Sequence, residues 1–188
     1  GGSNLEAEVE ALARGLEAFP DCAVLSDEIY SRLYFDGASH LSLLGFEALR
    51  DRLIVLDGWS KTYAMTGWRL GWGIWPASMI GAATKLAINI HSCVNAPAQA
   101  AALAALEGPQ DDVETMRLAF QARRDLIHAR LNALPGVTAA RPKGAFYAFP
   151  NISGLGLSAQ QVQDHWLEDL NVAAIAGTSF GAAGEGYV

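Results

Sequence analysis

The chain has 188 residues, of which 51% are hydrophobic and 18% are charged, and its formal net charge is -7. A chain of this length and composition can bury a substantial core, so a protein that is disordered throughout is excluded. The acidic charge balance also argues against nucleic acid or a membrane surface as a partner, because both require clustered Lys and Arg side chains.

A helix and two strands are predicted first. Apolar residues recur at helical spacing from Leu5 to Leu16, and Phe19-Pro20 ends this pattern. Short apolar runs at 22–25 and 53–56 are each followed by polar residues, which is typical of strands in a covered parallel sheet. The segment between the two runs ends in a predicted helix. We therefore expect a strand, a crossover and a second strand, as in α/β proteins.

A third strand is predicted at 71–75, and the sequence beyond Pro76 is alanine-rich and helical. The stretch 70–106 contains a single charged residue, Lys85, which raises the question of a membrane span. Its glycines, prolines and amide side chains would be poorly tolerated in lipid, so we expect the buried structure of a soluble protein there.

A long amphipathic helix is predicted after Gly108-Pro109, with Asp111 as its N-cap. Pro135-Gly136 ends the apolar pattern of this helix. Its length would suit a link between two lobes.

A small α+β lobe is predicted for the rest of the chain. Strands are expected at 145–149 and 172–176. Between them we expect a helix that begins at Ser158, with Gln161 completing a capping box.

Side chains with useful chemistry follow the first two predicted strands. Ser26-Asp27-Glu28-Ile29-Tyr30 follows the first, and Asp57-Gly58-Trp59-Ser60-Lys61 follows the second. Ligands bind at the carboxyl ends of strands in open α/β sheets, so an acid and a phenol are expected to face a lysine there. A pyridoxal phosphate site requires such a set: a lysine for the Schiff base, an acid that keeps the pyridine nitrogen protonated, and further donors.

The segment Trp59–Trp72 closely resembles the lysine segment of fold-type I pyridoxal-phosphate-dependent aminotransferases of class I/II, which are aspartate-aminotransferase-like. Further segments resemble the same family in the expected order, so the resemblance covers essentially the whole chain; they are 26–30, 92–99, 142–147 and 177–188. It implies amino-group transfer between an amino acid and a 2-oxo acid, with pyridoxal 5′-phosphate as the cofactor and a homodimer as the assembly.

Carried onto this sequence, the resemblance implies a role for each of five residues. Lys61 would hold the cofactor as a Schiff base and then move the substrate proton, acting as nucleophile and general base in turn. Asp27 would pair with the pyridinium nitrogen, and Tyr30 would donate a hydrogen bond to the phenolic oxygen of the ring. Arg69 would clamp the phosphate as a planar donor fork, and Ser60 is a second candidate for that phosphate.

The resemblance also implies an α/β fold: part of the mainly parallel-sheet large domain plus a smaller α+β C-terminal domain. Residues 1–118 would be the C-terminal part of the large cofactor-binding domain, and 119–188 the small domain, incomplete at its C-terminus. The family places the arginine that binds the substrate carboxylate directly after a sequence like the one ending at Val188. Gly58 stands where the family often has a hydroxyl side chain. We expect the chain to be the C-terminal portion of a longer enzyme, inactive alone.

Two other functions stay open on the sequence alone. A related fold-type I enzyme, such as a β-lyase, would use the same four residues, Lys61, Asp27, Tyr30 and Arg69, because they serve chemistry that both reactions share. Alternatively, the chain folds and associates without binding the cofactor productively. Each of the four also has an ordinary structural role available, as a surface lysine, a strand-end acid, a half-buried aromatic or an ion-pair partner. Only their joint placement favours a function.

No metal site and no disulfide framework are predicted. The two cysteines, Cys22 and Cys93, lie far apart and belong to no CxxC motif. The four histidines have no metal-ligand spacing. A reducing cytoplasm is therefore the expected location.

Overall fold

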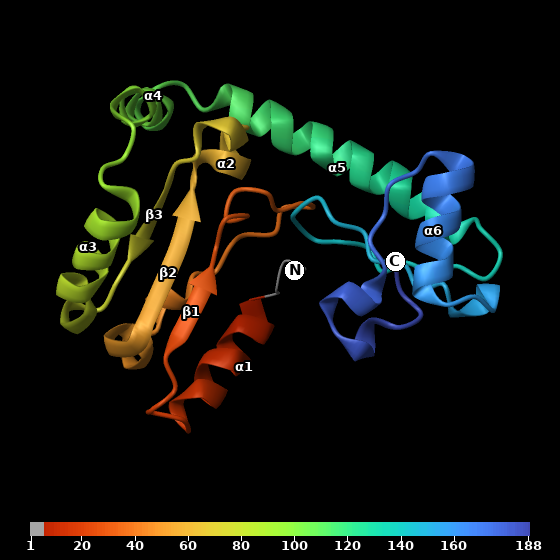
Figure 1. Ribbon diagram of the computed structural model, residues 1–188, viewed down its shortest axis with the longest axis horizontal. Helices are drawn as coiled ribbons and strands as arrows, with labels where there is room; N and C mark the ends of the chain where they lie inside the picture. The colour runs from red at the N-terminus through yellow and green to blue at the C-terminus, as the bar shows by residue number, and fades with distance from the viewer. Residues whose placement is uncertain (1–5) are drawn as a thin grey trace. The chain divides into compact units, whose positions relative to one another are not determined.

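The computed structural model describes residues 6–188, which divide into two compact units (Figure 1). The first unit consists of residues 6–118 together with Lys143–Ala145, and the second of 119–142 together with Phe146–Val188. Helix α5 (Asp111–Asn132) contributes its first residues to the first unit and its remaining residues to the second. Each unit has an apolar core of its own.

A sheet with the strand order β1-β2-β3 lies at the centre of the first unit. Strands β1 (Val24–Asp27) and β2 (Leu53–Gly58) are parallel, as predicted, whereas β3 (Gly71–Ile74) is antiparallel to β2. The C-terminal ends of β1 and β2 and the first residue of β3 therefore share one edge of the sheet (Figure 1). Strand β1 begins later than the run at 22–25 predicts.

Helix α1 (Glu6–Glu17) confirms the first predicted helix, although Leu5 lies outside the described residues. The acidic side chains in its first turn stabilise this helix, because they lie at the positive end of the helix dipole. The crossover between β1 and β2 contains two 3₁₀ helices, η1 (Leu43–Gly45) and η2 (Glu47–Arg52), where the sequence predicts a helix. These elements share a core with β2 that consists of Val9, Ala13, Leu43, Leu49, Leu53 and Val55.

Helix α2 (Trp59–Thr62) follows β2 directly, and η3 (Thr66–Trp68) precedes β3. Beyond β3 lie α3 (Ala77–His91) and α4 (Ala96–Glu107). The side chain of Asn95 caps α4 by accepting a hydrogen bond from the Ala98 N–H at 2.9 Å.

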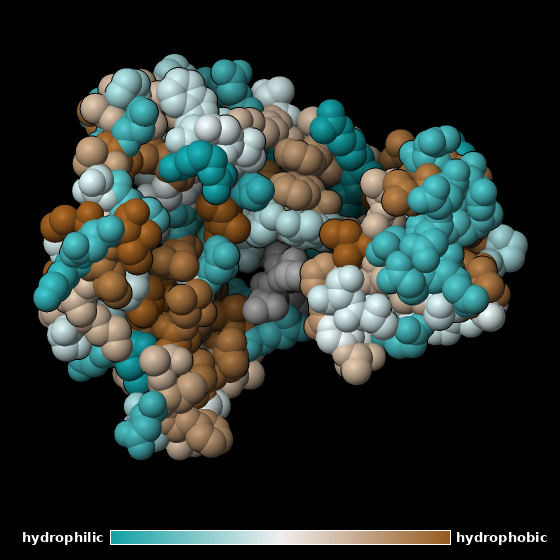
Figure 2. All heavy atoms as spheres, in the orientation of Figure 1, coloured by the Kyte–Doolittle hydropathy of each residue, from teal (hydrophilic) through white to brown (hydrophobic). Residues whose placement is uncertain are grey.

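The expectation of buried structure at 70–106 is wrong for α3, which has no buried residue. Figure 2 shows hydrophobic side chains gathered on the face that carries α3 and the sheet. The large apolar side chains exposed on β3 and α3 are Trp72, Ile74, Ile80, Leu86, Ile88 and Ile90. Within residues 6–188, no helix combines the length and the apolar character needed to cross a bilayer.

The second unit is built around α5 and α6 (Ala159–Leu170). Helix α6 begins with the predicted capping box, in which the Ser158 hydroxyl accepts from the Gln161 N–H and the Gln161 side chain accepts from the Ser158 N–H. The buried core consists of Leu131, Val137, Ile152, Ala159, Val162, Ala176 and Val188. Short 3₁₀ helices lie at η4 (Ser153–Leu155), η5 (Gly177–Phe180) and η6 (Ala182–Gly184).

Three local predictions for the C-terminal half are wrong. Asp111 is the first residue of α5, in its acidic first turn, and not its N-cap. The predicted strand at 145–149 is absent, and Ala145 has a φ of 58°, in the left-handed region that no strand uses. The predicted strand at 172–176 is also absent, and the Ala176 N–H donates to the side chain of Gln163 instead of to a neighbouring strand.

Candidate active site

One edge of the sheet in the first unit brings together the segments that the sequence predicts for the cofactor. Asp27 is the last residue of β1 and lies opposite Leu56 of β2. Gly58 is the last residue of β2 and lies opposite Gly71, the first residue of β3. Helix α2, which carries Ser60 and Lys61, starts directly at this edge (Figure 1).

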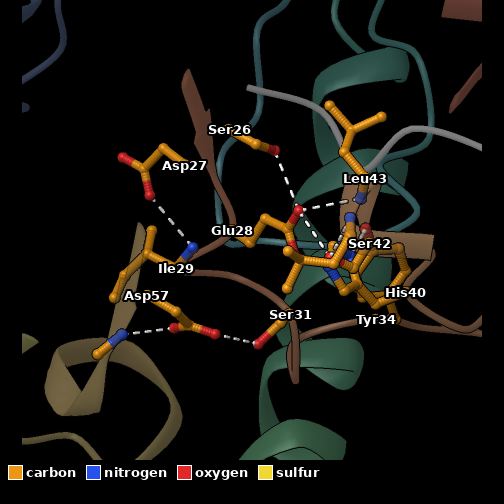
Figure 3. Close-up of polar contacts among 12 residues, drawn as sticks. Ser26, Asp27, Glu28, Ile29, Ser31, Tyr34, His40, Ser42, Leu43 and Asp57 are labelled. Carbon is orange, nitrogen blue, oxygen red and sulfur yellow. Dashed lines mark hydrogen bonds and ion pairs between the residues drawn. The ribbon is translucent and has the colours of Figure 1, made fainter. Parts of the chain in front are cut away.

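Asp27 presents an exposed carboxylate at the end of β1. Side chains alternate along a strand, so the Asp27 side chain faces solvent while that of Glu28 is buried, and Figure 3 shows the two carboxylates pointing in different directions. The Oδ1 atom of Asp27 accepts a hydrogen bond from the Ile29 N–H at 3.2 Å. Tyr30 lies in the turn that follows and is partly exposed, and its carbonyl accepts from the Leu33 N–H at 2.9 Å.

Ser60 and Lys61 are both partly exposed, and contacts of Trp59 fix the helix that carries them. The Trp59 N–H donates to the carbonyl of Leu70 at 3.4 Å. The indole Nε1 of Trp59 donates to the carbonyl of Ala102 in α4 at 3.1 Å. These contacts tie the start of α2 both to the segment before β3 and to α4.

Arg69 lies two residues before β3, at the same edge of the sheet. Its backbone is left-handed, with φ 53° and ψ 51°, and it ends the short helix η3. A left-handed backbone costs a non-glycine residue roughly 1 kcal/mol, so the surrounding contacts hold this conformation against its preference. The Arg69 side chain is exposed, and its Nη1 donates to the Thr66 carbonyl at 2.9 Å.

A network of polar side chains centres on the buried carboxylate of Glu28, the residue that directly follows β1 (Figure 3). Its Oε1 atom accepts from the hydroxyls of Ser26 at 3.1 Å and Ser42 at 3.0 Å, and from the Leu43 N–H at 3.2 Å. Its Oε2 atom lies 2.7 Å from Nε2 of His40. Because an ionised carboxylate only accepts hydrogen bonds, Nε2 of His40 carries the hydrogen of this contact.

The network continues to Tyr34, whose hydroxyl lies 3.1 Å from Nδ1 of His40. Burial alone would raise the pKa of Glu28, but the hydrogen bonds from His40 and Ser42, the charge of His40 and the Leu43 N–H together hold that pKa below its ordinary value. Burial and the nearby charge of Glu28 raise the pKa of Tyr34. Tyr34 is therefore a neutral phenol at physiological pH.

A second carboxylate, Asp57, lies near the end of β2 and contacts the turn that carries Tyr30. Its Oδ2 atom accepts from the Ser31 hydroxyl at 2.8 Å, and its Oδ1 atom accepts from the Gly58 N–H at 2.6 Å. Burial raises the pKa of Asp57, and the hydrogen bonds from Ser31 and Gly58 oppose that shift without cancelling it.

Glu28, His40 and Asp57 received no role from the sequence. Glu28 could have been noticed, because strand alternation places its side chain opposite to that of Asp27. His40 gives no such signal, since it lies in an irregular segment and meets Glu28 only through the fold. Among residues 6–188, no group of three or more His, Cys, Asp or Glu side chains could hold a metal ion.

Comparison with known proteins identifies relatives along the whole chain. The sequence model of the family "Aminotransferase class I and II" matches residues 5–188. An aspartate aminotransferase from Pyrococcus horikoshii is 36% identical over 189 residues, which covers 100% of this chain and 48% of the relative. An arginine–pyruvate transaminase from Pseudomonas aeruginosa is 38% identical over 188 residues, covering 100% of this chain and 47% of the relative.

The chain is also similar in fold to solved structures of aminotransferases. The crystal structure of an aromatic aminotransferase from Pyrococcus horikoshii OT3 has a TM-score of 0.92 and 37% identity, covering 98% of this chain and 50% of that one. An aspartate aminotransferase from Rhizobium meliloti has a TM-score of 0.90 and 32% identity, covering 97% and 48%. The fold is thus aspartate-aminotransferase-like, and the chain spans about half the length of the relatives it matches.

Proposed function

Because the chain belongs to the class I and II aminotransferase family, we propose that the protein carrying it transfers an amino group between an amino acid and a 2-oxo acid. In this proposal pyridoxal 5′-phosphate is bound as a Schiff base to Lys61. One structural observation supports the proposal in addition to family membership. One edge of the sheet brings together the ends of β1 and β2, helix α2 and the start of β3. That edge carries an acid, a phenol, an amine and a guanidinium.

The residues at this edge fit the chemical groups of pyridoxal phosphate. The exposed carboxylate of Asp27 suits a protonated ring nitrogen, and the partly exposed phenol of Tyr30 suits the ring's phenolic oxygen. The exposed guanidinium of Arg69 suits a phosphate, for which it offers paired donors. The amine of Lys61 suits the aldehyde, and the Ser60 hydroxyl is a further phosphate donor. When bound, the cofactor supplies an electron sink for negative charge at the substrate Cα.

The roles of the side chains follow from these chemical matches. The carboxylate of Asp27 holds a proton on the ring nitrogen, which keeps the ring positively charged. Tyr30 orients the ring by donating to its phenolic oxygen. Once freed by substrate, the Lys61 amine would take the proton from the substrate Cα as a general base and give it to the C4′ carbon of the cofactor as a general acid. Arg69 anchors the phosphate throughout.

We propose further that residues 1–118 belong to the large cofactor-binding domain and residues 119–188 to the small domain. The division of the described residues near Leu118 supports this assignment. The exposed apolar side chains of β3 and α3 support a homodimer or another large interface in the full-length protein. The two cysteines are free and exposed, which suits a reducing cytoplasm.

The proposal is tested by locating the cofactor on the full-length protein. Borohydride reduction followed by peptide mass mapping should place the modification on Lys61 and not on Lys85 or Lys143, the other two lysines of this chain. Lys61→Ala should abolish the visible absorption band of the bound cofactor, whereas Lys85→Ala, which changes an exposed lysine of α3, should retain it. Modification of another lysine would overturn the assignment.

An activity assay separates amino-group transfer from β-elimination. Exchange between amino donors and 2-oxo acids supports the proposal. Release of ammonia and pyruvate in the absence of such exchange would instead identify the β-lyase, because Lys61, Asp27, Tyr30 and Arg69 would serve both reactions.

A further inference from the structure

We propose that Glu28 is a positioning residue for the candidate site, and that its buried carboxylate fixes the turn presenting Asp27 and Tyr30. This inference rests on the proposed function, because it assigns those two side chains to the cofactor ring. It concerns a residue that makes no contact with the ring in the proposal. Glu28 acts through the backbone on either side of it.

The carboxylate of Glu28 accepts hydrogen bonds from one neighbouring residue and from three residues 12 to 15 positions further along the chain. It accepts from Ser26 in β1, from His40 and Ser42 in the segment before η1, and from the N–H of Leu43, the first residue of η1. A buried carboxylate with this many partners is held in one orientation, since moving it would leave several donors unpaired. The first turn after β1 is thereby tied to the segment that precedes η1.

The other side of the same turn is tied to β2. The Glu28 N–H donates to the Leu56 carbonyl at 2.8 Å, and the Ser31 N–H donates to the Glu28 carbonyl at 2.8 Å. The Ser31 hydroxyl then donates to Asp57 at 2.8 Å. In the sequence, Tyr30 therefore lies between two anchored residues, Glu28 and Ser31, and Asp27 directly precedes the first of them. Figure 3 shows Asp27, Glu28 and Ser31 with these contacts.

The far end of the network is anchored as well. Tyr34, whose hydroxyl meets His40, pairs through its backbone with Gly144 in an isolated antiparallel bridge. Its carbonyl accepts from Nη1 of Arg117 in α5 at 3.0 Å. The Glu28 network thus connects the turn at the candidate site to a braced part of the first unit, which a positioning role requires.

The test uses Glu28→Ala and Glu28→Gln in the full-length protein. Alanine leaves the donors of His40, Ser42 and Leu43 without their acceptor. Glutamine can keep most contacts if His40 changes tautomer, accepting at Nε2 and donating from Nδ1 to Tyr34. We expect Glu28→Ala to weaken pyridoxal phosphate binding by roughly tenfold to a hundredfold, and Glu28→Gln to restore most of the affinity. The matched control is Asp169→Asn, which removes an exposed carboxylate 2.6 Å from Nδ1 of His165.

Two further readouts separate positioning from general stability. The pH at which the visible absorption band titrates should shift in Glu28→Ala in the same direction as in Tyr30→Phe, because both disturb the same donor to the ring. In the cofactor-free protein, amide hydrogen exchange at residues 28–33 should accelerate at least about tenfold relative to the rest of the first unit. This second measurement does not depend on the cofactor.

The outcomes are distinguishable. If Glu28→Ala lowers the melting temperature but leaves the titration midpoint, the cofactor affinity and the local exchange rates unchanged, the positioning role is overturned. If the wild-type protein carries no cofactor on Lys61, the proposed function fails. In that case unchanged exchange at 28–33 in Glu28→Ala would also overturn the inference, and accelerated exchange would sustain Glu28 as the residue that holds this turn.

Discussion

Gly58 and Gly71 face each other across the antiparallel pair β2–β3, and a Cβ atom on Gly58 would lie 2.9 Å from the Cα of Gly71. The same Cβ would lie 2.8 Å from the carbonyl oxygen of Leu70. Real Cβ contacts are essentially never this short with backbone, so the two segments approach each other only because Gly58 has no side chain. The approach sets the distance between the start of α2, with Lys61, and the segment that carries Arg69.

Gly58→Ser therefore tests whether the hydroxyl side chain common in the family can be added here. We expect it to push β2 away from the segment before β3, to destabilise the protein by about 1–3 kcal/mol and to weaken cofactor binding. Denaturant unfolding and cofactor titration of the full-length protein measure both effects. Gly15→Ala, which adds a methyl group to α1 with nothing within 4 Å, should be neutral or stabilising. Tighter cofactor binding in Gly58→Ser would contradict this account.

Asp27→Asn should separate cofactor binding from turnover. The amide keeps the shape of the carboxylate and can still accept from the Ile29 N–H, but it cannot stabilise a positive charge on the ring nitrogen. We expect cofactor binding to change little and the transfer rate to fall roughly a hundredfold or more. Single-turnover kinetics measure the rate, and Asp21→Asn, at another exposed aspartate of the same unit, is the control. A near wild-type rate would show that Asp27 is not the partner of the ring.

The contributions of Glu28 and Asp57 to the free energy of unfolding should change with pH in opposite directions. The lowered pKa of Glu28 means that its ionised form stabilises the fold above its ordinary pKa, and that this contribution is lost as pH falls through the lowered value. The raised pKa of Asp57 means that its contribution is present at acid pH and lost as pH rises through the raised value.

Unfolding of the cofactor-free protein from about pH 4 to pH 7 measures both contributions. We expect the stability lost in Glu28→Gln to grow as pH rises. Asp57→Asn can still accept from Gly58 and donate to Ser31, so it should match or exceed the wild-type stability at pH 7, with the difference shrinking at acid pH. The same pH slope in both variants would refute this assignment of opposite shifts.

The parts of the fold that were predicted correctly depend on residue patterns within short stretches of the sequence. The capping box of Ser158 and Gln161 involves residues one helical turn apart, and the structure confirms it. The parallel pair β1–β2 follows from two apolar runs separated by a crossover, and it is also confirmed. The strand predicted at 145–149 is wrong, because its apolar residues suggested a strand while nothing in the sequence marked the left-handed backbone of Ala145. The Ala145 N–H donates to the carbonyl of Leu33, which is distant in the sequence.

In the candidate site, too, the residues next to strands could be predicted from the sequence, whereas the contacts between distant segments could not. Asp27 and Lys61 follow neighbouring strands, which sequence reasoning could place at one edge, although their roles stay predictions. The contact between Glu28 and His40 joins the residue just after β1 to a residue in an irregular segment. No spacing rule connects such residues, because the path between them is set by how Leu43 and its neighbours pack into the core. The network is visible only in three dimensions.

The described surface of the first unit exposes several large apolar side chains on β3 and α3. Trp72 and Ile74 of β3 are 41% and 42% exposed, and Ile88 and Ile90 of α3 are 59% and 68% exposed. Contiguous apolar faces of this kind mark surfaces that another chain segment or subunit covers. The relatives, about twice as long as this chain, contain enough additional sequence to cover them.

We therefore expect the 188-residue chain by itself, supplied with pyridoxal phosphate, to transfer amino groups at less than roughly a hundredth of the rate of the full-length protein. Catalysis depends on a complete and rigid set of groups around the cofactor, and the proposed site takes only Lys61, Asp27, Tyr30, Ser60 and Arg69 from this chain. Its exposed apolar face should also make it self-associate, which light scattering would detect. A steady-state assay is the direct test, and a rate comparable to that of the full-length protein would show that this chain holds the whole active site.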